Sequence, residues 1–137
     1  MPKNKKNFDD TLISAPVSWG ELLDKITILE IKEKQIPDRS RLQNVQRELR
    51  LLKTLCKSSR MAVRGLKALR TELKKINVEI WNLENSIRGH EKREDFGADF
   101  VKIARTIRQY NDQRSIIKRE INALLNSALV EEKFHEV

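Results

Sequence analysis

Apolar residues in the C-terminal part of the chain recur at alternating steps of four and three positions. The series is Phe96, Phe100, Ile103, Ile107, Tyr110, Arg114, Ile117, Ile121, Leu124 and Ala128. This spacing places the side chains on one face of a helix and is typical of coiled-coil packing. Arg114 interrupts the apolar series, and a charged side chain on a buried face requires a partner. The pattern predicts a helix from about residue 96 to beyond Asn126, with a buried polar contact at Arg114.

A first helix is predicted near the N-terminal end. Ser18 and Glu21 have the spacing of a capping box, in which each side chain satisfies a free backbone N–H of the first turn. We therefore expect the helix to begin at Trp19 and to run to about Gln35. Pro37 and the residue after it form the turn that follows.

Two more helices are predicted in the middle of the chain, over about residues 39–57 and 60–88. Gly89 is expected to end the second of them, and residues 91–95 form a charged turn. The supporting apolar positions are Leu42, Val45, Leu49, Leu52 and Cys56, then Ala62, Leu66, Leu69, Leu73, Ile76, Ile80, Leu83 and Ile87. Short turns make consecutive helices antiparallel neighbours. The predicted fold class is all-α: an antiparallel bundle of about four helices with a long coiled-coil-like C-terminal hairpin.

Composition agrees with one helical domain. Of 137 residues, 35% are charged and only 5% aromatic, which suits exposed helices around an aliphatic core. We expect a flexible basic arm over residues 1–14 and a single domain over residues 15–137. The chain has one cysteine, Cys56, no signal-like N-terminus and no apolar run of membrane-spanning length. These features predict a cytoplasmic protein without a membrane span.

The long hairpin predicts association. The second helix is too short to cover residues 79–104, which should extend beyond it by about 18 Å. That end carries the apolar side chains Ile80, Leu83, Ile87, Phe96, Phe100 and Ile103. Two helices alone cannot cover this seam, so we expect a homodimer or a helical protein partner. The alternative is that the first helix or the N-terminal segment folds back over it.

The net charge of +8 is concentrated in one stretch. Residues 39–70 contain ten Lys and Arg and a single acidic residue, Glu48, whereas the flanking regions are nearly neutral. This stretch is either a solvated helical face or a surface for a polyanion or an acidic partner. It contains no aromatic side chain for base stacking. The candidate polyanion surface consists of Arg47, Arg50, Lys53, Lys57, Arg60, Arg64 and Lys67.

A polar site between helices is the second candidate. Counting residues outward from the turns places Asp24 level with Arg114, and Glu30 near Arg108. Asp24 and Arg114 are therefore expected to form a buried ion pair. Its role is either to fix the helix register or, with Lys25 and Lys118, to bind an anionic group.

A polar stripe on the third helix faces polar residues of the fourth. It is either a ligand site or an interhelical salt-bridge ladder beside the apolar seam. The candidate ligand-binding residues of the whole inter-helix site are Asp24, Lys25, Glu30, Trp81, Glu84, Arg88, Arg105, Asn111, Asp112, Arg114 and Lys118.

Signatures of catalysis are weak. Glu21 and Asp24 have the spacing of a carboxylate pair that could hold Mg²⁺ on one helix face, as in all-α nucleotide pyrophosphohydrolases. Glu21 already serves the capping box, however, and no second pair stands opposite. His90 and His135 occupy a helix end and the tail, so neither is placed as a general base. We expect no cofactor, except Mg²⁺ if the chain is a hydrolase.

Three segments resemble a family of small bacterial and phage proteins of unknown function, with an N-terminal motif PVSxGELxDKxxILEIK. The segments are residues 15–32, 81–88 and 111–122. The resemblance implies a link to surface-polysaccharide or phage functions, because such genes are met near glycosyltransferase genes. Its motif residues are Asp24, Lys25, Glu30, Trp81, Glu84, Arg88, Asn111, Asp112, Arg114, Lys118 and Asn122.

The function predicted from these features is that of a cytosolic helical-bundle binding or adaptor protein with a polar inter-helix site for an anionic ligand or partner. One alternative is a metal-dependent hydrolase of a nucleotide or another phosphorylated substrate. The other is a nucleic-acid-associated accessory protein.

Overall fold

The computed structural model describes residues 11–136, and all regular structure in this range is helical. The helices are α1 (Trp19–Gln35), α2 (Arg39–Thr54), α3 (Leu66–Lys92) and α4 (Ala98–Leu124), with a 3-10 helix η1 (Ser59–Ala62) between α2 and α3. The predicted all-α class is confirmed, with no strand within the described range. Most of the predicted basic arm, residues 1–10, lies outside the described residues.

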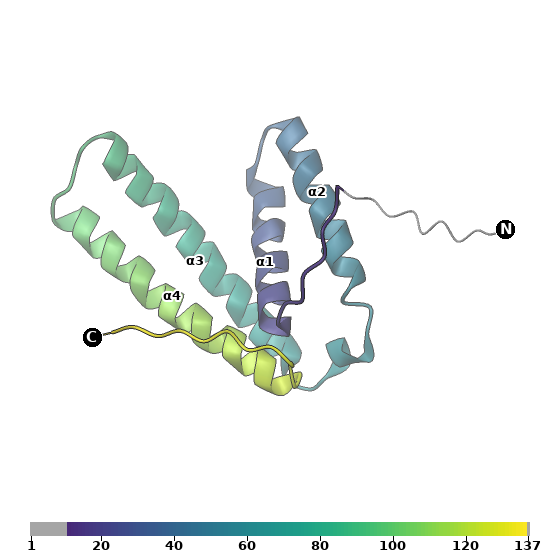
Figure 1. Ribbon diagram of the computed structural model, residues 1–137. Helices are drawn as coiled ribbons and strands as arrows, with labels where there is room; N and C mark the ends of the chain where they lie inside the picture. The colour runs from purple at the N-terminus through teal and green to yellow at the C-terminus, as the bar shows by residue number, and fades with distance from the viewer. Residues whose placement is uncertain (1–10, 137) are drawn as a thin grey trace.

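Helix α1 is central and packs against the three other helices. Figure 1 shows α2 beside α1, and α3 and α4 as a long antiparallel hairpin that meets the first half of α1 and then diverges from it. The largest fully buried apolar side chains come from α1 (Leu23, Ile26), α3 (Leu66, Leu73) and α4 (Ile121). One hydrophobic core therefore joins α1 to the hairpin, and α2 covers the other side of α1.

The predicted start of the third helix is wrong. The chain forms η1 and then an extended residue, Val63, and α3 begins only at Leu66. Gly65 precedes it with a φ of +94°, a left-handed conformation that interrupts a helix and that favours glycine. The apolar period through Ala62 and Leu66 continues across this break, which explains why periodicity alone missed it.

The predicted ends of α3 and α4 also need correction. Gly89 lies within α3, which continues to Lys92 and ends where Glu94 adopts a φ of +56°. Helix α4 begins at Ala98 and ends at Leu124, where Asn126 adopts a φ of +51°. At each end a 6→1 backbone hydrogen bond closes a Schellman motif, so a non-glycine residue provides the left-handed stop.

The expected extensive pairing of α2 with α3 is not observed, because the linker of residues 55–65 lets α2 pack mainly on α1. The far end of the hairpin is covered mainly by its own two helices. Ile80 is buried, Phe100 is half-buried in edge-to-face contact with Phe96, and Phe96 remains 53% exposed. The N-terminal segment lies on the α2 side of α1, away from this end, so the fold-back alternative is not observed for residues 11–18 (Figure 1).

The tail after α4 turns back and runs along that helix (Figure 1). Glu131 pairs with Lys118 at 3.0 Å, and Glu132 pairs with Arg119. Among residues 11–136, none of the helices has the length and apolar character needed to cross a membrane.

Candidate functional site

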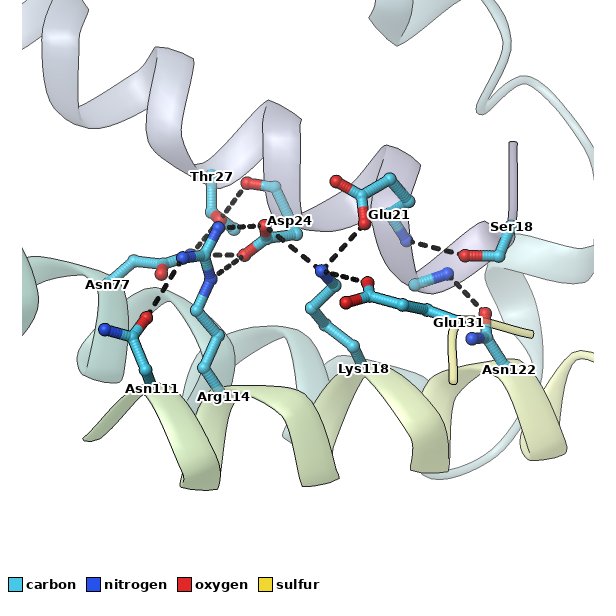
Figure 2. Close-up of polar contacts among 11 residues, drawn as sticks. Ser18, Glu21, Asp24, Thr27, Asn77, Asn111, Arg114, Lys118, Asn122 and Glu131 are labelled. Atoms are coloured by element: carbon cyan, nitrogen blue, oxygen red, sulfur yellow. Dashed lines mark hydrogen bonds and ion pairs between the residues drawn. The ribbon is translucent and has the colours of Figure 1, made fainter. Parts of the chain in front are cut away.

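Asp24 is the centre of the polar contacts between α1, α3 and α4, and its side chain is 1% exposed. Its Oδ1 accepts hydrogen bonds from Asn77 Nδ2 and from Arg114 Nε, each at 2.9 Å. Its Oδ2 accepts a second hydrogen bond from Arg114, through Nη2 (Figure 2). The predicted buried pair of Asp24 and Arg114 is confirmed, and it is bidentate.

Further polar groups complete this centre. Asn77 Nδ2 also donates to Thr27 Oγ1 at 2.8 Å, and the Thr27 hydroxyl donates to the Asp24 carbonyl. Asn111 Oδ1 accepts a long hydrogen bond from Arg114 at 3.4 Å. Every buried side-chain nitrogen and oxygen among the described residues has a partner. The Asp24 centre is therefore satisfied internally, and it holds three helices in one register rather than presenting an open charge.

Lys118 forms a second group of contacts one turn further along α4. Its Nζ lies 2.7 Å from Glu21 Oε2, 3.0 Å from Glu131 Oε2 and 3.9 Å from Asp24 Oδ2 (Figure 2). Burial lowers the pKa of the Lys118 ammonium, but hydrogen bonds to the two glutamates outweigh this and leave the pKa raised. The hydrogen bond from Lys118 in turn lowers the pKa of Glu131.

The Arg114 guanidinium is held in its charged form. Its hydrogen bonds to Asp24 raise its pKa above the ordinary value, although partial burial opposes the shift. Both acidic residues of the predicted metal pair, Glu21 and Asp24, thus face cationic side chains. No group of three or more His, Cys, Asp or Glu side chains is arranged to hold a metal ion within residues 11–136.

Hydrogen bonds join the start of α1 to residues at and just after the end of α4. Gly20 N donates to Asn122 Oδ1 at 2.7 Å, and Trp19 N donates to Ser127 Oγ at 3.2 Å. A Cβ on Gly20 would collide with the Lys118 carbonyl oxygen, so this position requires glycine for close approach of the two helices. This contact positions Asp24, one turn later in α1, over Arg114.

A groove between α1 and α3 brings together several predicted site residues. Its volume is about 480 Å³. It runs along α3 from Asn77 to Arg88, and the wall from α1 is formed by Ile28 and Ile31. The other lining residues are Ile80, Trp81, Glu84, Asn85 and Arg114. The groove thus combines an apolar wall, a half-buried tryptophan and charged groups at one end.

Other predicted site residues lie elsewhere. Lys25 pairs with Glu48 of α2 at 2.9 Å. Glu30 does not approach Arg108; its Oε2 lies 3.8 Å from both Lys53 and Lys74. The reason is that the side of α1 that carries Glu30 lies toward α2 and the start of α3. The side that carries Asp24 contacts α4.

The exposed polar residues of α4 form no joint site with the groove. Arg108 pairs with Asp112 along the helix, at 3.9 Å, and both side chains are largely exposed. Arg105 is exposed beside Ala98 and Val101. The expected facing rows on α3 and α4 are therefore not formed by these residues.

The predicted polyanion residues divide into three groups. Arg60 donates to the Leu125 carbonyl and caps the end of α4. Arg47, Arg50, Lys57 and Arg64 are exposed on α2 and the linker. Lys53 lies 3.8 Å from Glu30, and Lys67 lines the same pocket as Glu30, together with two basic residues of α3, Arg70 and Lys74.

Several residues of these sites were missed by the sequence analysis. Thr27 follows Asp24 by three positions and so shares its helix face. Asn122 was named above only through the family resemblance; it also continues the series Arg114, Lys118 at steps of four on α4. Glu131 had no periodic signal, because it lies in the tail.

Comparison with known proteins places the chain in a family. No curated protein and no solved structure shows significant similarity to it. A family model described as a family of unknown function (DUF6165) matches residues 13–137. That range contains all four helices, the Asp24 centre and the groove. The chain therefore belongs to this family of unknown function, DUF6165.

Proposed function

We propose that the chain is a binding or adaptor protein and that the α1–α3 groove holds an amphipathic helical segment of a partner protein. The observation that carries the proposal is the apolar lining of the groove by Ile28, Ile31, Ile80 and Trp81. The groove follows eleven residue steps of α3 from Asn77, about 16 Å, which is three turns of a bound helix. Apolar anchors at helical spacing on such a segment fit a groove of this kind.

Charged side chains at one end of the groove favour a partner that carries an acidic residue at the matching position. Glu84 and Arg88 both line it, and neither has a carboxylate or cationic partner within ion-pair distance among residues 11–136. Arg114 is already occupied by Asp24. Arg88 is therefore the cation that would meet an acidic residue of the partner, and the net charge of +8 favours encounter with acidic partners generally. The lone cysteine fits a cytoplasmic setting.

The proposal can be tested with helical peptides selected by display on the purified protein. Binding is then followed by the fluorescence of Trp81 in a Trp19→Phe background. Ile28→Arg and Arg88→Glu should each weaken the selected peptides about tenfold, the loss expected for one important contact. The matched control is Arg105→Glu, which reverses an exposed arginine outside the groove.

Failure to select any peptide, or equal loss of binding in Arg88→Glu and Arg105→Glu, would contradict the proposal. Sedimentation of the wild-type protein and of Ile28→Arg together shows whether the groove is instead occupied by a second copy. In that case Ile28→Arg would convert an oligomer to a monomer, and the partner assignment would be wrong.

A further inference from the structure

A second concave site lies where α1 meets η1 and the first turns of α3. It has a volume of about 390 Å³. Its lining residues are Thr27, Glu30, Met61, Lys67, Arg70, Thr71 and Lys74. This volume lies within the range of small-molecule sites. None of the lining residues is aromatic, so the site offers charge and hydrogen bonds rather than a stacking surface.

Cationic groups converge on this pocket. Lys67, Arg70 and Lys74 occupy positions i, i+3 and i+7 of α3, so they share one face of its first turns. Lys53 of α2 does not line the pocket but lies beside it, with Nζ 3.8 Å from Oε2 of the lining residue Glu30. Four cations and one carboxylate give a local charge of 4 − 1 = +3.

The single carboxylate does not neutralise these cations. Glu30 Oε2 is 3.8 Å from Lys53 Nζ and 3.8 Å from Lys74 Nζ, beyond hydrogen-bond distance in both cases. No carboxylate of the described residues lies within ion-pair distance of Lys67 or Arg70. Among the described residues, these neighbouring cations therefore have few protein acceptors, an arrangement that a polyvalent anion would stabilise.

The location of the pocket at the N-terminal end of α3 adds to its positive electrostatic potential. The first turn of α3 contains no acidic residue, and its N-cap, Gly65, provides no side-chain hydrogen bond. The positive end of the helix dipole therefore acts in the same direction as the cationic side chains. The Thr71 hydroxyl donates its hydrogen to the Lys67 carbonyl, so within the pocket it can only accept hydrogen bonds. It adds no charge.

We propose that this pocket binds a small phosphorylated molecule through a diphosphate group. Each phosphate carries about −1.5 to −2 at neutral pH when it is terminal, so a diphosphate matches the local charge in a way that one carboxylate does not. Arg70 supplies a planar fork for two phosphate oxygens, and the lysines supply point charges around it. The site is separate from the α1–α3 groove, and it does not depend on the partner proposed there.

The test is calorimetric titration of the full chain with inorganic pyrophosphate and with ADP in a phosphate-free buffer. Lys67→Gln/Arg70→Gln should weaken both ligands about tenfold or more, since charge-assisted hydrogen bonds are lost. The matched control, Arg50→Gln/Lys57→Gln, removes the same charge from exposed positions outside the pocket and should change affinity less than about twofold. Similar affinities for the two ligands would show that the diphosphate alone is recognised, and tighter binding of ADP would add a nucleoside contact.

Glu30→Gln provides an independent arm, because structural damage does not tighten binding. Removal of this repelling carboxylate should strengthen pyrophosphate binding about threefold. Absence of binding to the wild type, or equal weakening by the pocket and control variants, would overturn the proposal and leave only diffuse attraction of anions to a basic surface.

Discussion

Asp24→Ala should strongly destabilise the protein. The substitution removes the two carboxylate oxygens that accept hydrogen bonds from the Arg114 guanidinium, one of which also accepts from Asn77, and leaves Arg114 only the long contact with Asn111. Loss of one partner of a buried ion pair costs about 3–5 kcal/mol. The Arg114 side chain is 24% exposed and can turn partly to water, which places the expected loss near the lower limit, about 3 kcal/mol.

Arg114→Met should be at least as harmful, because it leaves the more deeply buried group without its main partner. The Asp24 carboxylate would retain the hydrogen bond from Asn77, with Lys118 Nζ 3.9 Å away. Asp24→Leu/Arg114→Met removes both charges and should therefore be less destabilised than the sum of Asp24→Leu and Arg114→Met, by at least about 1 kcal/mol.

The assay is urea denaturation followed by circular dichroism, with the free energy of unfolding compared at constant m. Asp112→Ala is the matched control, because its carboxylate is exposed and pairs only along α4; it should change stability by no more than about 0.5 kcal/mol. If Asp24→Ala is as mild as Asp112→Ala, or if the two single changes simply add, the pair does not stabilise the fold as described.

Three further outcomes are expected. Gly20→Ala should destabilise by about 1–3 kcal/mol in thermal melts, since its Cβ meets the backbone of α4; a gain in stability, as helix propensity alone predicts, would contradict this contact. The lowered pKa of Glu131 means that its contribution to tail docking is present above the ordinary glutamate pKa and lost as the pH falls through the lowered value. NMR titration should therefore give a higher pKa for Glu131 in Lys118→Met than in the wild type, and identical values would exclude the contact in solution. We expect the wild type to be a dimer by light scattering and Phe96→Glu/Val101→Glu to be a folded monomer, because both side chains are about half exposed at the hairpin end; a monomeric wild type would rule this out.

Local signals in the sequence were sufficient for much of the fold. Ser18 accepts from Glu21 N at 3.1 Å, and α1 has the predicted bounds because the capping signal lies within four residues. The pairing of Asp24 with Arg114 could also be predicted. Asp24 and Arg114 each lie within the apolar face of a helix. Few packings of the two helices bury both faces without leaving one of these charges unpaired.

The remaining errors arose where backbone conformation or tertiary packing decided the outcome. The left-handed residues Gly65, Glu94 and Asn126 end or delay helices that the apolar period would continue. Glu30 was misplaced because its partners depend on where α2 packs, and that follows from the linker rather than from any repeat. Arg70 and Lys74 carry no motif, and only the folded α3 places them with Lys53.

The contacts of Asp24 also set an order for folding during synthesis. Arg114 lies 90 residues after its partner Asp24. Asn122 lies 102 residues after Gly20, from whose backbone N–H it accepts a hydrogen bond. While the ribosome has made only α1 and α2, the Asp24 carboxylate has neither its arginine nor its asparagine and remains hydrated. A nascent chain halted before α4 should therefore keep the first half of α1 accessible to proteases and chaperones, and the fold closes only after the last helix has emerged.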